Sequence, residues 1–163
     1  MILELEGVPS DQGVASSRGE SETAKSVASW AAAGRHALRQ THTFGDSFAK
    51  AIEGLTAIYQ ECHRPNWDGY GAEPVRDETF WMAYRVIVAL PCGIPAPGMG
   101  ADPDGDITLE WHRSVWRTLS ISVSADGSLH YAALFGSTTQ YGTELFLGEV
   151  PRSILELIRR VQA

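Results

Sequence analysis

The chain has 163 residues, of which 44% are hydrophobic and 20% are charged, as is ordinary for a globular protein of one domain. The 13 Lys and Arg residues against 20 Asp and Glu residues give a net charge of −7. We therefore expect no direct binding to nucleic acid, because a phosphate backbone is neutralised by clustered cations. No apolar run approaches the ~18 residues of a membrane span, and no secretory signal is recognisable. Two cysteines, Cys62 and Cys92, are too few for a disulfide framework, which favours a cytoplasmic location.

The N-terminal quarter of the chain has a different composition from the rest. Residues 1–21 are rich in Gly, Ser and Asp, which predicts a flexible tail. Residues 22–163 are then predicted to form a single α+β domain. Within it, the alanine-rich residues 22–40 predict a peripheral helix, whose centre Gly34 weakens by ~1 kcal/mol relative to alanine.

Two amphipathic helices are predicted in the middle of the chain. Apolar residues at helical spacing predict the first over residues 47–62, with Asp46 or Ser47 as its N-cap. Asp77 is the predicted N-cap of the second, which ends at Pro91. The following segment, CGIPAPGMGADPDGD, is so rich in Pro and Gly that we expect no regular structure there.

The hydrophobic period then changes from 3.6 to 2. Residues 107–112 and 119–124 alternate between apolar and polar, and Ala125-Asp126-Gly127-Ser128 predicts a hairpin turn into a third strand, LHYAALF. The alternation places Trp111 on the apolar face. Residues 136–141 are predicted to form a turn, and TELFLGEV adds a fourth strand.

Pro151 is predicted to stand in the first turn of a last helix, which carries apolar residues at Ile154, Leu157, Ile158 and Val161. Strands grouped together and joined by short turns indicate an antiparallel meander. The predicted fold is therefore α+β: a three- to four-stranded antiparallel meander with helices before it and one C-terminal helix packing on one face.

The most unusual string is Asn66-Trp67-Asp68-Gly69-Tyr70-Gly71-Ala72. One interpretation is that Trp67 and Tyr70 fold inward, because large aromatic side chains are costly to expose, while Asn66 and Asp68 hydrogen-bond the turn. The other is a recognition surface, since Trp and Tyr are enriched at interface hot spots. In that interpretation Trp67, Asp68, Tyr70 and Glu73 bind a partner.

A second acidic group, Asp102, Asp104 and Asp106, resembles the start of a calcium loop. An EF-hand needs Gly at the sixth position and Glu at the twelfth, where this chain has Ile107 and Arg113. We expect no metal site here, and no zinc site either, because paired Cys or His ligands at short spacing are missing. These three carboxylates are instead predicted to form a second acidic patch for partner binding.

Sequence signatures of catalysis are also missing. The chain has no G-x-S-x-G elbow, phosphate loop or dinucleotide fingerprint, so we expect no cofactor and no standard catalytic site. One enzymatic alternative stays open, a hydrolase or nuclease with a non-standard site built on Asp68, Glu110 and His112.

The strings N-W-D-G-x-G-A and D-G-x-I-x-L-E-W carry a resemblance over residues 48–160. In these motifs the chain resembles a group of small bacterial proteins of unassigned function. The resemblance implies a bacterial or phage-encoded chain with an intact fold, and it implies no activity, cofactor or catalytic residue.

We expect a protein–protein interaction module that binds and neutralises or escorts a partner, such as an antitoxin, an immunity protein, a chaperone or a phage-encoded anti-defence inhibitor of the anti-CRISPR kind. The expected partner is another protein, basic or itself nucleic-acid-binding, because an acidic surface speeds the capture of a basic one. Self-assembly, as a homodimer formed through a sheet edge or the last helix, is the third hypothesis.

Overall fold

The computed structural model describes Val27 and residues 45–163, which form a five-stranded sheet and three helices, α2, α3 and α4. The tail predicted over residues 1–21 and the helix predicted over 22–40 lie outside the described residues, except for Val27. Val27 is helical and buried, and it belongs to the hydrophobic core.

The two predicted central helices are confirmed, with small differences at their ends. Helix α2 spans Gly45–Cys62 and so begins before the residues predicted as its cap. Helix α3 spans Asp77–Val88, so that Asp77 is its first helical residue and Arg76 is the N-cap. The Tyr59 hydroxyl donates a hydrogen bond to the Asp77 carboxylate and so ties α2 to the start of α3. Burial and then this hydrogen bond raise the pKa of Tyr59 above its ordinary value.

The sheet is an antiparallel meander in the order β1-β2-β3-β4-β5. Its strands are β1 (Gly98–Ala101), β2 (Ile107–Ser114), β3 (Arg117–Val123), β4 (Ser128–Phe135) and β5 (Thr138–Leu145). The α+β class and the meander are confirmed, but the sheet has five strands rather than three or four.

The additional strand is β1, in the segment predicted to be irregular. It follows Pro97 and pairs with β2 from Gly98↔Glu110 to Ala101↔Ile107. Strand pairing uses backbone groups, so a Gly-Met-Gly-Ala segment forms an edge strand without the side-chain alternation that predicts strands. The predicted turn over residues 136–141 was also too long, and the predicted fourth strand over residues 143–150 began and ended too late, because β5 spans Thr138–Leu145.

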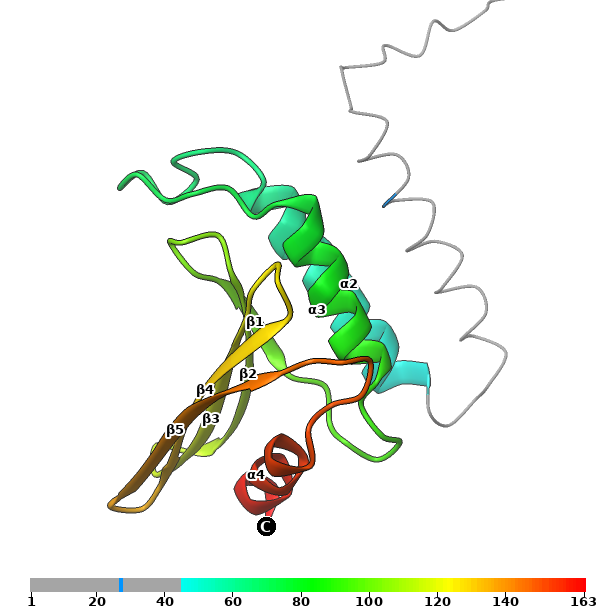
Figure 1. Ribbon diagram of the computed structural model, residues 1–163, viewed down its shortest axis with the longest axis vertical. Coiled ribbons are helices and arrows are strands. Elements are labelled where there is room, and N and C mark those ends of the chain that lie inside the picture. The colour runs from blue at the N-terminus through cyan, green and yellow to red at the C-terminus, as the bar shows by residue number, and fades with distance from the viewer. Residues whose placement is uncertain (1–26, 28–44) are drawn as a thin grey trace, which may run out of the picture.

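All three described helices pack on the same face of the sheet (Figure 1). Helix α4 spans Arg152–Gln162, with Pro151 as its N-cap rather than in its first turn, and it buries the four predicted apolar residues. They join the inward-facing side chains of the strands in one core, including Leu109, Trp111 and Ile121. Trp111 is buried as predicted, and its Nε1 donates to the Pro95 carbonyl at 2.9 Å.

Candidate functional site

The two segments predicted to bind a partner meet at one end of the sheet. The backbone N–H of Glu73 donates to the Pro103 carbonyl at 2.8 Å, which joins the loop after α2 to the loop before β2. The approach is so close that a Cβ on Gly105 would lie 2.8 Å from the Pro74 carbonyl oxygen. We call residues 66–74 and 102–106 the tip; it lies at the upper left of the coloured ribbon in Figure 1.

The first loop of the tip is held by its own polar side chains. Asn66 adopts a left-handed backbone conformation with φ of 60°, and its Oδ1 accepts a hydrogen bond from the Gly71 N–H at 2.7 Å. Asp68 Oδ1 accepts from the Tyr70 N–H at 2.8 Å and from the Ala72 N–H at 3.1 Å. The hydrogen bond from the Tyr70 N–H, above all, lowers the pKa of Asp68. The Asp68 side chain therefore shapes the loop, as Asn and Asp do in turns.

The two aromatic residues of this loop have different environments. Trp67 is half-buried against the core, and its Nε1 donates to the Glu73 carbonyl at 3.0 Å. Tyr70 is 95% exposed. The inward-folding interpretation therefore describes Trp67 but not Tyr70.

The second loop of the tip is anchored to the sheet through two of its three aspartates. Asp102 Oδ2 accepts hydrogen bonds from the Thr108 and Ser122 hydroxyls, both at 2.7 Å. Asp106 Oδ2 accepts from the Ser124 hydroxyl. Asp104 is exposed, and its Oδ1 accepts only a long bond of 3.3 Å from the Asp106 N–H. Two of these carboxylates thus fix the loop, and Asp104 is the one presented to solvent.

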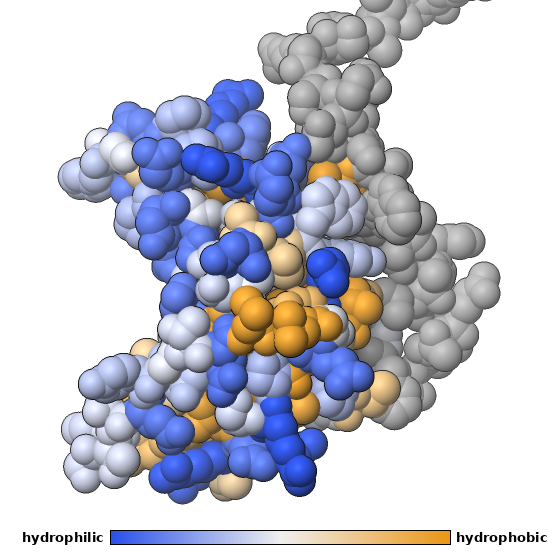
Figure 2. Space-filling model, viewed as in Figure 1, coloured by the Kyte–Doolittle hydropathy of each residue, from blue (hydrophilic) through white to orange (hydrophobic). Residues whose placement is uncertain are grey.

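The surface of the tip is polar and acidic. Figure 2 shows mostly hydrophilic residues at the upper left of the coloured surface, where the tip lies. The tip carries five carboxylates, from Asp68, Glu73, Asp102, Asp104 and Asp106, and no Lys or Arg. Over the described residues, no three His, Cys, Asp or Glu side chains are arranged to hold a metal ion.

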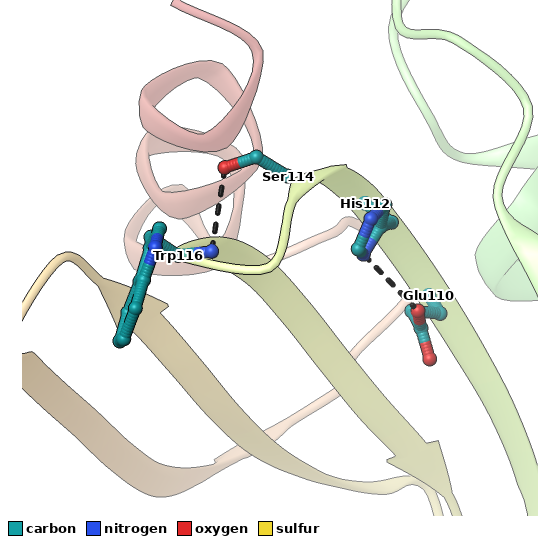
Figure 3. Close-up of polar contacts among 4 residues, drawn as sticks. All are labelled: Glu110, His112, Ser114 and Trp116. Atoms are coloured by element: carbon teal, nitrogen blue, oxygen red, sulfur yellow. Dashed lines mark hydrogen bonds and ion pairs between the residues drawn. The ribbon is translucent and has the colours of Figure 1, made fainter.

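The residues of the enzymatic alternative are only partly brought together. Glu110 and His112 are neighbours on the polar face of β2, with the Glu110 Oε1 4.0 Å from the His112 Nδ1 (Figure 3). Both line a groove of about 610 Å³ at the β1 edge, together with Asp102. Asp68 does not line this groove, and its Oδ1 is occupied by backbone N–H groups.

Two further features were missed by the sequence reasoning. Arg117 and Arg160 line one pocket, although they are 43 positions apart in the sequence. Val88, the last residue of α3, and Leu147, just after β5, are exposed apolar side chains. No local pattern predicts the pair of arginines, because it depends on where α4 lies against the sheet.

Comparison of the chain with models of protein families, with curated proteins and with solved structures finds no match. The resemblance to the group of small bacterial proteins therefore stays a prediction. Among the helices of the described part, none has the length and apolar character needed to cross a membrane.

Proposed function

We propose that the chain is a protein–protein interaction module that binds a basic partner protein through the tip. The observation that carries the proposal is Tyr70, whose side chain is 95% exposed on a loop in which the Asn66 and Asp68 side chains accept hydrogen bonds from backbone N–H groups. Exposing a large aromatic ring forgoes the stabilisation that its burial would give. Because these hydrogen bonds already order the backbone of the loop, binding through the ring would remove less backbone conformational freedom than binding through a mobile loop.

The charge of the tip supports a basic partner. Two carboxylates of the tip are exposed: Glu73, three residues after Tyr70, and Asp104, next to the Pro103 whose carbonyl accepts from the Glu73 N–H. The tip contains no Lys or Arg that would neutralise them. An exposed tyrosine and exposed carboxylates on the same pair of loops suit a partner surface rich in Lys and Arg, because the ring can be buried in the complex and the charges speed association. Such a surface is found on toxins and nucleic-acid-binding enzymes, which an antitoxin or an anti-defence inhibitor would cover.

The proposal includes a cytoplasmic location. Cys62 and Cys92 are both free thiols, which suits a reducing compartment.

The test is affinity capture from a lysate of the source cells, with the recovered proteins quantified by mass spectrometry. Three baits are compared: the natural chain, Tyr70→Ala and Tyr141→Ala. Tyr141 is the matched control, because it is also a tyrosine, is 81% exposed and lies on β5 outside the tip. We expect a basic protein that the Tyr141→Ala bait retains and the Tyr70→Ala bait loses, and whose recovery falls as salt is raised.

Thermal unfolding of the three baits accompanies the capture. Equal melting temperatures are expected, since neither ring is buried. A partner retained equally by both variants would contradict the proposal, and so would a partner of strongly acidic composition.

Self-association is a second candidate, favoured by strand β5. It is an edge strand of the sheet with one charged residue, Glu144, and no proline, although edge strands are commonly protected by charges or proline. Tyr141 and Leu145 on β5, and Leu147 just after it, are exposed. An antiparallel pairing of two β5 strands would make the mass in light scattering double as concentration rises, and Tyr141→Lys, but not Tyr70→Ala, would prevent it.

A further inference from the structure

A pocket with two arginines lies at the end of the sheet opposite the tip. It has a volume of about 380 Å³ and is lined by Ser114, Trp116, Arg117, Phe135, Gly136 and Arg160. The tip precedes the first residue of β2, whereas this pocket is formed where β2 ends and β3 begins, together with the β4–β5 turn and α4. Its volume falls within the range of about 300–1,000 Å³ that is typical of small-molecule sites.

The walls of the pocket are fixed by the fold. The Gly136 N–H donates to the Trp116 carbonyl at 2.7 Å, which joins the β2–β3 turn to the β4–β5 turn. Ser114 ends β2 and Trp116 lies on the first of these turns, near α4 (Figure 3), and the Ser114 Oγ accepts from the Trp116 N–H at 3.3 Å. The site is therefore built from backbone that two hairpins hold in place.

The two arginines have no carboxylate partner among the side chains that the structure describes. The described ion pairs involve Glu110 with His112 and Arg152 with Glu156, and neither includes Arg117 or Arg160. The guanidinium carbon of Arg160 lies 4.0 Å from the centre of the Phe135 ring, so stacking orients this side chain without neutralising it.

The dipole of α4 explains the position of only one of the two arginines that line the pocket. Arg159 and Arg160 both stand in the last turn of α4, where a cation interacts favourably with the helix dipole. The dipole does not account for Arg117, which comes from β3 and faces the same pocket. Arg117 and Arg160 are both exposed on this pocket and neither has an acidic partner, so an anion bound in the pocket would be attracted by both charges.

We infer that this pocket binds a phosphate monoester whose organic part includes a flat aromatic ring, as in a nucleoside monophosphate. Two guanidinium groups match the double negative charge of the phosphate and donate paired hydrogen bonds to its oxygens. The Ser114 hydroxyl is a third donor at the same wall. Trp116 is 63% exposed beside the pocket, and its indole offers a stacking surface for the ring.

The inference goes beyond the proposed function, because none of the six pocket residues belongs to the tip. The test is isothermal titration calorimetry of the full chain with adenosine 5′-monophosphate, adenosine and inorganic phosphate at millimolar concentrations. We expect the monophosphate to bind more tightly than either adenosine or phosphate alone. Arg117→Gln and Arg160→Gln are each expected to weaken it about tenfold or more.

Arg159→Gln is the matched control, because it removes the same charge from the same helix turn but does not line the pocket. It should leave affinity within about twofold, since an exposed charge outside the pocket contributes little. Arg160→Lys keeps the charge over Phe135 but lacks the planar fork, so it should fold normally and still bind more weakly than the natural chain. Trp116→Ala should bring the affinity for the monophosphate down to that for inorganic phosphate.

Three results would overturn the inference. The first is no heat of binding with any of the three probes. The second is an equal loss of affinity in Arg159→Gln and Arg117→Gln, which would indicate general charge attraction. The third is that inorganic phosphate binds to the natural chain as tightly as the monophosphate does, which would show that the ring of the ligand contributes nothing to binding.

Discussion

The contact between the two loops of the tip can be tested with one added methyl group. Gly105 has a φ of +89°, and a Cβ at this position would lie 2.8 Å from the Pro74 carbonyl oxygen. Gly105→Ala therefore has two costs: about 1–2 kcal/mol for an L-residue in a left-handed conformation, and about 1–3 kcal/mol for the overlap. The expected loss in the free energy of unfolding is about 2–5 kcal/mol.

Gly93→Ala isolates the second cost. Gly93 has a φ of +90°, nearly the same as Gly105, but a Cβ there would have no atom within 4 Å. Both substitutions lower the entropy of the unfolded chain equally. The Gly93→Ala variant should therefore lose only about 1–2 kcal/mol, and the difference between the two variants measures the approach of the loops.

Urea unfolding followed by tryptophan fluorescence gives both free energies. Hydrogen exchange of the Glu73 amide adds a local measurement, because this N–H donates to Pro103 across the contact. Its exchange should accelerate in Gly105→Ala and not in Gly93→Ala. If the two variants lose the same stability and the Glu73 amide stays protected from exchange, the two loops of the tip do not contact each other as described.

Three further predictions concern the residues that hold the site in place. The pKa of Tyr59 is raised in the folded state, so the unfolded chain releases the hydroxyl proton first as pH rises past ~10. The free energy of unfolding should then fall by up to about 1.4 kcal/mol per pH unit. Urea midpoints measured at rising pH should show this slope in the natural chain and a shallower one in Tyr59→Phe. Asp102→Ala loses two hydrogen bonds from hydroxyls of β2 and β3 and should lower the free energy of unfolding by about 1–3 kcal/mol. Asp104 is exposed, so Asp104→Ala should change it by less than about 0.5 kcal/mol. Similar urea midpoints in the two variants would contradict the anchoring role of Asp102. Trp111→Ala should cost about 3–5 kcal/mol, measured in the same assay, and a loss below about 1 kcal/mol would place this ring outside the core.

The sequence predicted which residues lie at the proposed partner surface, but not which of them are exposed and which support the loops. All seven predicted binding residues lie in the tip, but only Tyr70, Glu73 and Asp104 are exposed. The others support the loops: Trp67 packs on the core, and Asp68, Asp102 and Asp106 accept hydrogen bonds from backbone or hydroxyl groups. A short string of acids and aromatics has the same composition in either role, so the distinction required the contacts.

The sequence by itself determined the helices α2, α3 and α4, the strands β2 to β4 and the antiparallel meander. In these segments the spacing of apolar residues matches the geometry of the helix or strand, so a local pattern reports which side chains are buried. The tertiary structure alone decided that Gly98–Ala101 forms an edge strand, that the two acidic loops join in one tip and that Arg117 meets Arg160. Each of these rests on backbone pairing or on side chains far apart in the chain, and neither leaves a periodic signal in the sequence.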